Sequence, residues 1–158
     1  MIYVGIDPGL GGAVAVIGPG HYVRLYDVPI LMLTKKREYD LASMVSIFSA
    51  FSLEVSLGQV HVALELVHAM PGQGVTSMFT FGRGTGLWEG ILAGLGLPYT
   101  KITPQRWKKA MLDGMPKEKD ASVVRAKQLF PGADLRLKKH HGRADALLIA
   151  EYLRRTLK

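Results

Sequence analysis

The hydrophobic pattern of the chain changes from short apolar runs, typical of strands, to apolar residues at helical spacing. Residues 2–6 form one such run, which stops at Asp7-Pro8-Gly9, and residues 13–17 form a second. Proline cannot donate to a strand ladder and the glycines permit a tight reversal, so the two runs predict a β-hairpin. Asp7 would then stand at the carboxyl end of a buried strand.

Turn and cap residues divide the rest of the chain into elements. Asp40 and Thr76 stand where helix N-caps are expected, and Thr103-Pro104 opens a helix with proline at its first position. The predicted elements, in order, are a strand over residues 21–28, an exposed connection over 29–39, a helix over 40–53, a strand over 60–66, a loop over 67–75, a helix over 76–95, a strand over 99–102, a helix over 104–112, a polar connection over 113–119, and helices over 120–130 and 142–157.

This order of elements predicts an α/β fold. Three meandering strands followed by β–α units give a five-stranded mixed sheet with helices on both faces, in one domain over residues 1–158. Small residues recur at every fourth position of the 76–95 helix and would present a flat side for close packing on the sheet. They are Gly82, Gly86, Gly90 and Gly94.

Composition narrows the class of protein. The chain has no cysteine, which excludes disulfides and thiolate metal sites and favours a reducing, cytoplasm-like compartment. No apolar run approaches the length of a membrane span, and the patterned strand at the start argues against a signal peptide.

The net charge of +7 is unevenly distributed. Residues 1–100 carry 5 basic and 7 acidic side chains, whereas residues 101–158 carry 15 basic and 6 acidic ones. Such asymmetry favours a polyanionic partner, with nucleic acid ahead of anionic lipid; the alternative is a solvated basic surface.

Two carboxylates are expected at one edge of the sheet. If the strands over 2–6 and 60–66 are parallel neighbours, Asp7 and Glu65 end at the same edge, where ligands of α/β sheets collect. Asp145, in the first turn of the last helix, is a third candidate. Two of them have a structural alternative: Asp7 could bind a turn amide, and Asp145 could cap the helix or neutralise its dipole. Together they predict a site for a hard divalent ion, Mg²⁺ or Mn²⁺, typical of a two-metal nuclease.

Five motifs resemble, in order and over essentially the whole chain, the RuvC family of Holliday-junction resolvases, and more closely its phage and chloroplast-type branch. They are IDPGLGG, LE at the end of the 60–66 strand, FGRGTGLWEGILAGLG, TPQRWKKAML and GRADALLIAEY. The resemblance implies a ribonuclease H-like fold and a homodimer that makes paired, metal-dependent nicks in a four-way DNA junction, leaving 5′ phosphate and 3′ hydroxyl ends. It implies no small-molecule cofactor and no membrane.

Carried over by position, Asp7, Glu65 and Asp145 match three of the four active-site residues of the family. The fourth, an acid or histidine three residues before the last aspartate, falls on Gly142 here. His141 is the nearest substitute, as a metal ligand or catalytic group, and His140 is the alternative.

The resemblance also suggests residues that contact DNA. The family's aromatic wedge, three residues after the glutamate, falls on His68, with Met70 close by; Phe79 and Phe81 are expected to pack on the sheet. Trp107 is expected to be a core anchor. The expected backbone contacts are Lys108, Lys109 and Lys119, and those of second rank are Lys35, Lys36, Arg37, Arg83 and Arg143.

Three other functions compete with junction resolution. A different ribonuclease H-like nuclease, acting on RNA–DNA hybrids or flaps, would share the carboxylates. A non-cleaving junction-binding protein would result if the altered fourth position had abolished activity. A sugar-kinase or actin-like ATPase needs two domains and a second phosphate loop, which 158 residues do not hold. For a nuclease we expect the cytoplasm of a bacterium, cell- or phage-encoded, with an organelle as the alternative.

Overall fold

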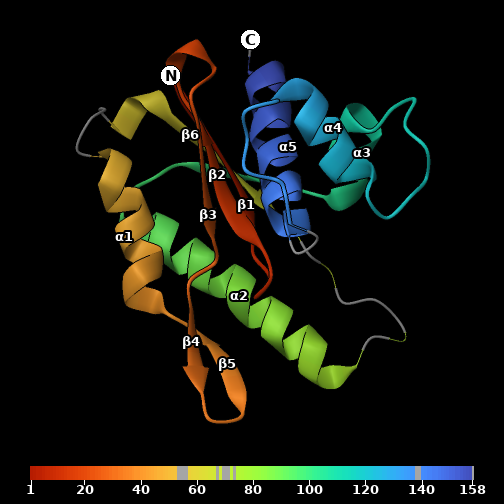
Figure 1. Ribbon diagram of the computed structural model, residues 1–158. Coiled ribbons are helices and arrows are strands. Elements are labelled where there is room, and N and C mark those ends of the chain that lie inside the picture. Colours follow the sequence, from red (N-terminus) through yellow and green to blue (C-terminus); the bar gives the residue numbers. More distant parts are fainter. Residues whose placement is uncertain (53–56, 67, 69–71, 73, 138–139, 158) are drawn as a thin grey trace.

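The computed structural model contains a five-stranded mixed sheet in the order β3-β2-β1-β6-β7 (Figure 1). It describes residues 1–52, 57–66, 68, 72, 74–137 and 140–157. Strands β1 to β3 are antiparallel, and β1–β6 and β6–β7 are parallel. The predicted five-stranded mixed sheet is therefore confirmed. The strands are β1 Ile2–Asp7, β2 Ala13–Ile17, β3 Val23–Asp27, β4 Ile30–Leu33, β5 Lys36–Tyr39, β6 Val60–Glu65 and β7 Tyr99–Ile102; the helices are α1 Leu41–Ser52, α2 Val75–Gly94, α3 Pro104–Met111, α4 Ala121–Leu129 and α5 His141–Thr156, with short 3₁₀ turns at Pro19–His21 and Leu57–Gln59.

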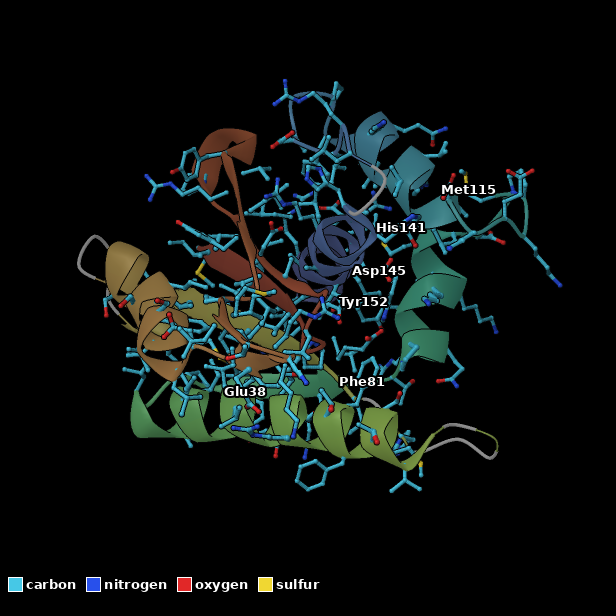
Figure 2. The ribbon with its side chains drawn as sticks, turned by 60° about the horizontal axis from the view of Figure 1, so that its bottom comes forward. Glu38, Phe81, Met115, His141, Asp145 and Tyr152 are labelled. Atoms are coloured by element: carbon cyan, nitrogen blue, oxygen red, sulfur yellow. The ribbon has the colours of Figure 1, made fainter. Side chains whose placement is uncertain are left out.

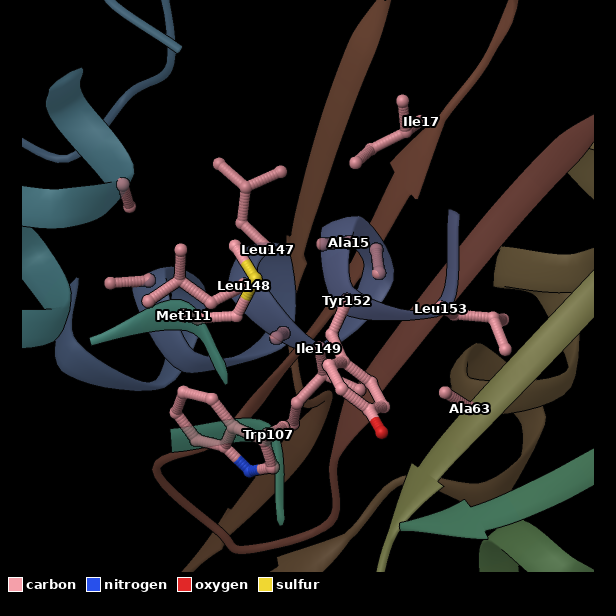
Figure 3. Packing of buried hydrophobic residues seen from close by; sticks show 14 of the residues in the cluster. Ala15, Ile17, Ala63, Trp107, Met111, Leu147, Leu148, Ile149, Tyr152 and Leu153 are labelled. Atoms are coloured by element: carbon pink, nitrogen blue, oxygen red, sulfur yellow. The ribbon is translucent and has the colours of Figure 1, made fainter. Parts of the chain in front are cut away.

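Helices cover both faces of the sheet, as the sequence predicts. On one face α5 lies along the central strands with α3 and α4 beside it, and on the other lie α1 and α2 (Figure 1). Figure 3 shows the first core, where Trp107 and Met111 of α3 pack against Leu147 and Leu148 of α5. The second core contains Phe48 of α1 and Trp88 of α2, whose rings meet edge to face with centroids 5.9 Å apart.

Two glycines allow α5 to lie directly on β1 and its turn. A Cβ at Gly5 would come within 2.1 Å of the Ala146 carbonyl oxygen, and one at Gly142 within 2.3 Å of the Gly11 carbonyl oxygen. Both distances are far below van der Waals contact, so any larger residue would push the helix off the sheet. This close approach sets the start of α5 beside the end of β1.

The segment over residues 29–39 is largely exposed, as expected, but it is more than a connection. It contains an antiparallel ribbon of β4 and β5, which projects from the body of the molecule (Figure 1). Leu33 pairs with Lys36 across a two-residue turn, Thr34-Lys35. That turn lacks the glycine or asparagine that is typical of a two-residue hairpin turn. The sequence therefore gives no signal from which this hairpin could be predicted.

The expectation that the α2 glycines pack on the sheet is also wrong. Gly84, Trp88 and Leu92 are the buried residues of this helix, and they face the sheet at four-residue spacing. The repeat of Gly82, Gly86, Gly90 and Gly94 is shifted by two residues, half a helical turn, and lies exposed. Phe79, also expected to pack on the sheet, is 72% exposed.

No helix in the described part of the chain is long and apolar enough to cross a membrane.

Candidate active site

Asp7 and Glu65 end two parallel neighbouring strands. In the β1–β6 ladder Ile6 pairs with Leu64, so the next residue of each strand reaches the same carboxyl edge. The Gly9 backbone N–H donates to Asp7 Oδ1 over 3.2 Å, while Glu65 is only 8% exposed. The parallel pairing expected from the sequence is confirmed, and it brings these two carboxylates together.

Asp145 joins them from α5, on which Figure 2 shows it. It follows the Gly142 contact by less than one helical turn, and its charge raises the pKa of both Asp7 and Glu65. Asp145 Oδ1 is buried and has no hydrogen-bond partner among the described residues. A buried carboxylate oxygen without a partner is costly, which is a feature expected where a ligand completes the site.

The three acids share an environment that disfavours their charge. Burial, followed by repulsion from Glu65, raises the pKa of Asp7 to about 7 from its ordinary value of 3.8. Burial also raises the pKa of Glu65 and of Asp145. The ammonium of Lys108 acts in the opposite direction on the pKa of all three acids. Neutralising such a cluster requires protons or a cation.

Trp107 has a second role besides the core packing that the sequence predicts. Its indole Nε1–H donates to Glu65 Oε1 over 2.8 Å, and this bond lowers the pKa of Glu65 against the effect of burial. The ring is fully buried, and the Lys108 ammonium lies 5.2 Å from the ring centroid. The start of α3 thus holds Glu65 in one orientation and keeps a cation next to it.

The two histidines before α5 differ in their surroundings. His140 is 3% exposed, and its Nδ1 accepts a bond from the Leu137 N–H over 3.4 Å. His141 is 35% exposed, and its Nε2 lies 3.4 Å from Asp120 Oδ1. It precedes Asp145 by four residues, on the same helix face, and lowers the pKa of that acid. Of the two histidines, His141 is the one that faces the carboxylates.

Divalent ions suit the chemistry of this donor set. The donors are carboxylate oxygens, which hard ions such as Mg²⁺ and Mn²⁺ prefer, and one of them lacks any partner in the described residues. Within the part of the chain that the structure describes, no three His, Asp or Glu side chains are arranged to hold one ion together.

The basic residues proposed from the sequence occupy different positions. Lys108, Lys109 and Lys117 line a groove of about 420 Å³ between α3 and the start of α4, and Lys119 is exposed on the same connection. His68 is exposed after β6, while Met70 lies outside the described residues. Arg83 pairs with Glu38 of β5.

Arg143 is engaged within the fold. Its guanidinium donates to Asp27 Oδ2 and to Asp134 Oδ2, both over 2.9 Å, and its side chain is 17% exposed. These bonds tie the first turn of α5 to β3 and to the segment before the helix. The geometry therefore favours a structural role for Arg143 over a contact with DNA.

Three residues around the site escape prediction from the sequence. Ser122 of α4 forms a hydrogen bond that lowers the pKa of Asp145. Tyr39 donates its hydroxyl to the carbonyl oxygens of Pro8, over 3.3 Å, and Thr80, over 3.2 Å, which fixes the turn after Asp7 against α2. The third is Trp107 as a partner of Glu65. An isolated serine, tyrosine or tryptophan carries no spacing signal, so nothing in the sequence indicates these roles.

Comparison with known proteins gives one sequence relative and several structural ones. Over 91 residues the chain is 43% identical to the chloroplastic Holliday junction resolvase MOC1 of Chlamydomonas reinhardtii; the match covers 56% of this chain and 10% of that protein. The chain thus spans about a tenth of the length of this relative. No family model matches the chain.

Solved structures of Thermus thermophilus RuvC have the same fold. RuvC in complex with a Holliday junction substrate matches with a TM-score of 0.62 and 17% identity, over 96% of this chain and 92% of that one. A second RuvC structure matches with a TM-score of 0.59 and 20% identity, over 99% and 96%.

Sheet order and helix placement are those of a ribonuclease H-like fold. Within this class the chain has the RuvC fold, and its sequence resemblance to RuvC-type resolvases is confirmed by the MOC1 match.

Proposed function

We propose that the protein is a structure-selective endodeoxyribonuclease that resolves four-way DNA junctions by paired nicks, leaving 5′ phosphate and 3′ hydroxyl ends. The observation that carries the proposal is the set of three acids, Glu65 buried and Asp7 and Asp145 partly buried, with raised pKa values at the sheet edge of a RuvC fold. The MOC1 relative, named as a Holliday junction resolvase, supports the choice of substrate. We expect such an enzyme in a compartment that contains DNA, either a bacterial cytoplasm or an organelle.

Asp7 is central to the proposed mechanism because the charges of both Glu65 and Asp145 act on it. With Glu65 it would hold one divalent ion, and with Asp145 a second. Such ions would activate the attacking water and neutralise the charge that develops on the leaving 3′ oxygen. Trp107 keeps Glu65 oriented through its indole bond, and Ser122 does the same for Asp145.

His141 would supply the fourth polar group. The position used by the family is closed to a side chain because Gly142 lies against the β1–β2 turn. His141 would orient the nucleophilic water or ease protonation of the leaving oxygen. His141→Ala should therefore slow nicking without abolishing junction binding, whereas a change at the buried His140 should act mainly on stability.

DNA would approach across α3 and the connection to α4. Lys108, Lys109 and Lys119 are proposed to contact the phosphate backbone, with Arg83 as a further candidate and His68 at the junction centre. Contacts of this kind make binding steeply dependent on salt. Arg143 is left out because its donors are bound to Asp27 and Asp134.

A homodimer would bring two such sites to opposite strands, and α2 offers a surface for it. The exposed glycines border an apolar groove of about 440 Å³ between α1 and α2, lined by Leu41, Val45, Leu87, Ile91 and Leu95. Exposed glycines let two helices approach closely, and a two-fold interface needs one self-complementary patch. We expect Gly90→Glu to shift the protein to a monomer in analytical ultracentrifugation. Thr100→Glu, on the exposed edge of β7, is the matched control; equal dimers for both variants would exclude this interface.

A substrate panel tests the activity. Purified protein with Mg²⁺ or Mn²⁺ should nick a labelled four-way junction in symmetric pairs, and should act far more slowly on linear duplex, flap and RNA–DNA hybrid. Preference for the hybrid or the flap would support another ribonuclease H-like nuclease. Tight junction binding without any nicking would indicate a junction-binding protein and overturn the proposal.

A further inference from the structure

A cleft of about 380 Å³ opens beside Asp7. Its walls come from three separate segments: the β1–β2 turn at Gly9 and Leu10, the ribbon strand β5 at Arg37 and Tyr39, and the first turns of α2. The cleft includes Asp7, whereas Glu65 and Asp145 do not line it. It therefore adjoins the acid cluster without being part of it.

The walls combine an aromatic face, a cation and hydroxyl groups. Phe81 rises from α2 on the side where Asp145 lies (Figure 2), and its ring comes within 3.3 Å of where a Gly9 Cβ would stand. Arg37 is exposed at the rim and forms no ion pair with any described residue. Thr76 and Ser77 are exposed on the α2 wall, and within the described part of the chain their hydroxyls have no partner.

The frame around the cleft is fixed. The Tyr39 hydroxyl binds the carbonyl oxygens of Pro8 and Thr80, and Glu38 pairs with Arg83, so β5 is attached to both the turn and α2. The Thr80 hydroxyl is used within the helix, donating to the Thr76 carbonyl oxygen over 2.8 Å. Arg37, Thr76, Ser77 and Phe81 are thus the groups left to meet a ligand.

An apolar, partly aromatic pocket with one cation and a few hydroxyls suits a ligand that has a flat ring and an anionic group. A nucleotide has both, and base–aromatic stacking together with arginine–phosphate contact are the usual ways to bind one in a single strand. We propose that this cleft is a subsite for the nucleotide next to the phosphate that is cut, and that it determines the sequence preference of nicking. The inference rests on the proposed function, because it takes Asp7 to mark the scissile phosphate.

In this subsite Phe81 is the stacking surface for the base, Arg37 contacts the neighbouring phosphate, and the hydroxyls of Thr76 and Ser77 read the base edge. They are specificity determinants and do not touch the reacting atoms. The neighbouring Lys35 and Lys36 are exposed at the end of the β4–β5 ribbon. They would extend the positive charge of Arg37 along the bound DNA strand.

The test compares nicking on junctions that carry each of the four bases at every position flanking the nick. Phe81→Leu should lower the nicking rate by about tenfold, since stacking contributes about 1–3 kcal/mol per base. Ser77→Ala should reduce the difference in nicking rate between the four bases at one flanking position. Thr100→Val, an exposed hydroxyl on β7 outside the cleft, is the matched control and should behave as the wild type. Unchanged rates and preferences in both cleft variants would overturn the inference while the proposed function stands.

A binding measurement separates failure of the subsite from failure of the proposed function. A 5′-phosphorylated deoxytrinucleotide, titrated into the isotope-labelled full chain, should shift the amide signals of Arg37, Thr76 and Ser77 by NMR. The same titration of Phe81→Leu should require about tenfold more ligand. If the wild type nicks no junction, the proposed function fails and this titration alone decides the subsite. Absence of shifts at these amides overturns the subsite in either case.

Discussion

Helix α5 carries two carboxylates whose surroundings have opposite effects on their pKa values. Near its middle, Glu151 is 2% exposed, and burial acts to raise its pKa, but hydrogen bonds from Arg154 and Arg155 outweigh burial and lower it. Those bonds are 2.7–2.8 Å long. Near its start, Asp145 has a raised pKa and one buried oxygen without a partner in the described residues.

The comparison distinguishes an acid that is paired within the fold, Glu151, from an acid that is left available to a ligand, Asp145. Two arginines compensate Glu151 permanently, as expected for a residue that stabilises the helix. In the described structure no arginine pairs with Asp7, Glu65 or Asp145, and the Lys108 ammonium does not offset their burial. A fold that can bury a compensated acid two turns away leaves these three uncompensated, as the proposed binding of divalent ions requires.

The largest expected effect is on catalysis. Asp7→Asn and Asp145→Asn should each lower junction nicking by about 1,000-fold or more, because an ion site worth several kcal/mol of transition-state stabilisation is lost. Junction binding, measured by gel shift, should survive. Glu151→Gln, which changes the compensated acid of the same helix, should cut at nearly the wild-type rate. Retained nicking in both site variants would remove the acids from the mechanism.

The second prediction reverses the usual effect of losing a charged residue. With metal removed near pH 8, Asp7→Asn should raise the free energy of unfolding by about 1–4 kcal/mol, since the wild type bears a partly buried, repelled charge there. Glu151→Gln should instead lower it by about 1–3 kcal/mol, because the bonds to two arginines are weakened. Urea denaturation measures both. A loss of stability in Asp7→Asn would mean that its charge is compensated after all.

The pH dependence of stability gives a third, smaller effect. The folded pKa of Asp7, about 7, lies above its unfolded value of 3.8, so the folded state binds more protons between these pH values. Stability from this group is therefore complete below pH 3.8 and falls as pH rises towards about 7. The decline should be shallower in Asp7→Asn. Identical slopes in metal-free denaturation curves from about pH 4 to 7 would contradict the assignment.

The smallest effect concerns the orientation of Glu65. Trp107→Phe keeps a buried ring but removes the indole donor, and should weaken metal binding by about 10- to 100-fold, the usual cost of losing a partner of a ligand. Trp88→Phe is the matched control, since this buried indole N–H has no partner in the described residues. Weaker metal binding in both variants, measured by titration with Mn²⁺, would show that general loosening of the core, not the Glu65 bond, is responsible.

Much of this fold is predictable because its core elements carry strong local signals. The uncharged strand before Asp7, the Asp40 cap and the Thr103-Pro104 start all match the structure, in which α1 begins at Leu41 and α3 at Pro104. The β4–β5 ribbon lacks a turn signature. The glycines of α2 are ambiguous because small residues suit close packing against a sheet and against a second protein equally well.

In the candidate site, too, some features can be predicted from the sequence and others depend on tertiary packing. The edge position of Asp7 and Glu65 follows from strand pairing, and Asp145 from its place at the start of a buried helix. The reason that the fourth family position is glycine, a 2.3 Å approach to the Gly11 carbonyl, depends on tertiary packing. The ion pair between Arg143 and Asp27 cannot be predicted from the sequence either, because the two partners are 116 positions apart.

The central claim is that the acids at the start of α5 are left uncompensated in order to bind divalent ions, and calorimetric titration with Mn²⁺ near pH 8 tests it most directly. The account predicts saturable binding of about two ions per chain, strongly reduced in Asp7→Asn and unchanged in Glu151→Gln. Absence of saturable binding to the wild type, or equal binding by Asp7→Asn, would contradict it.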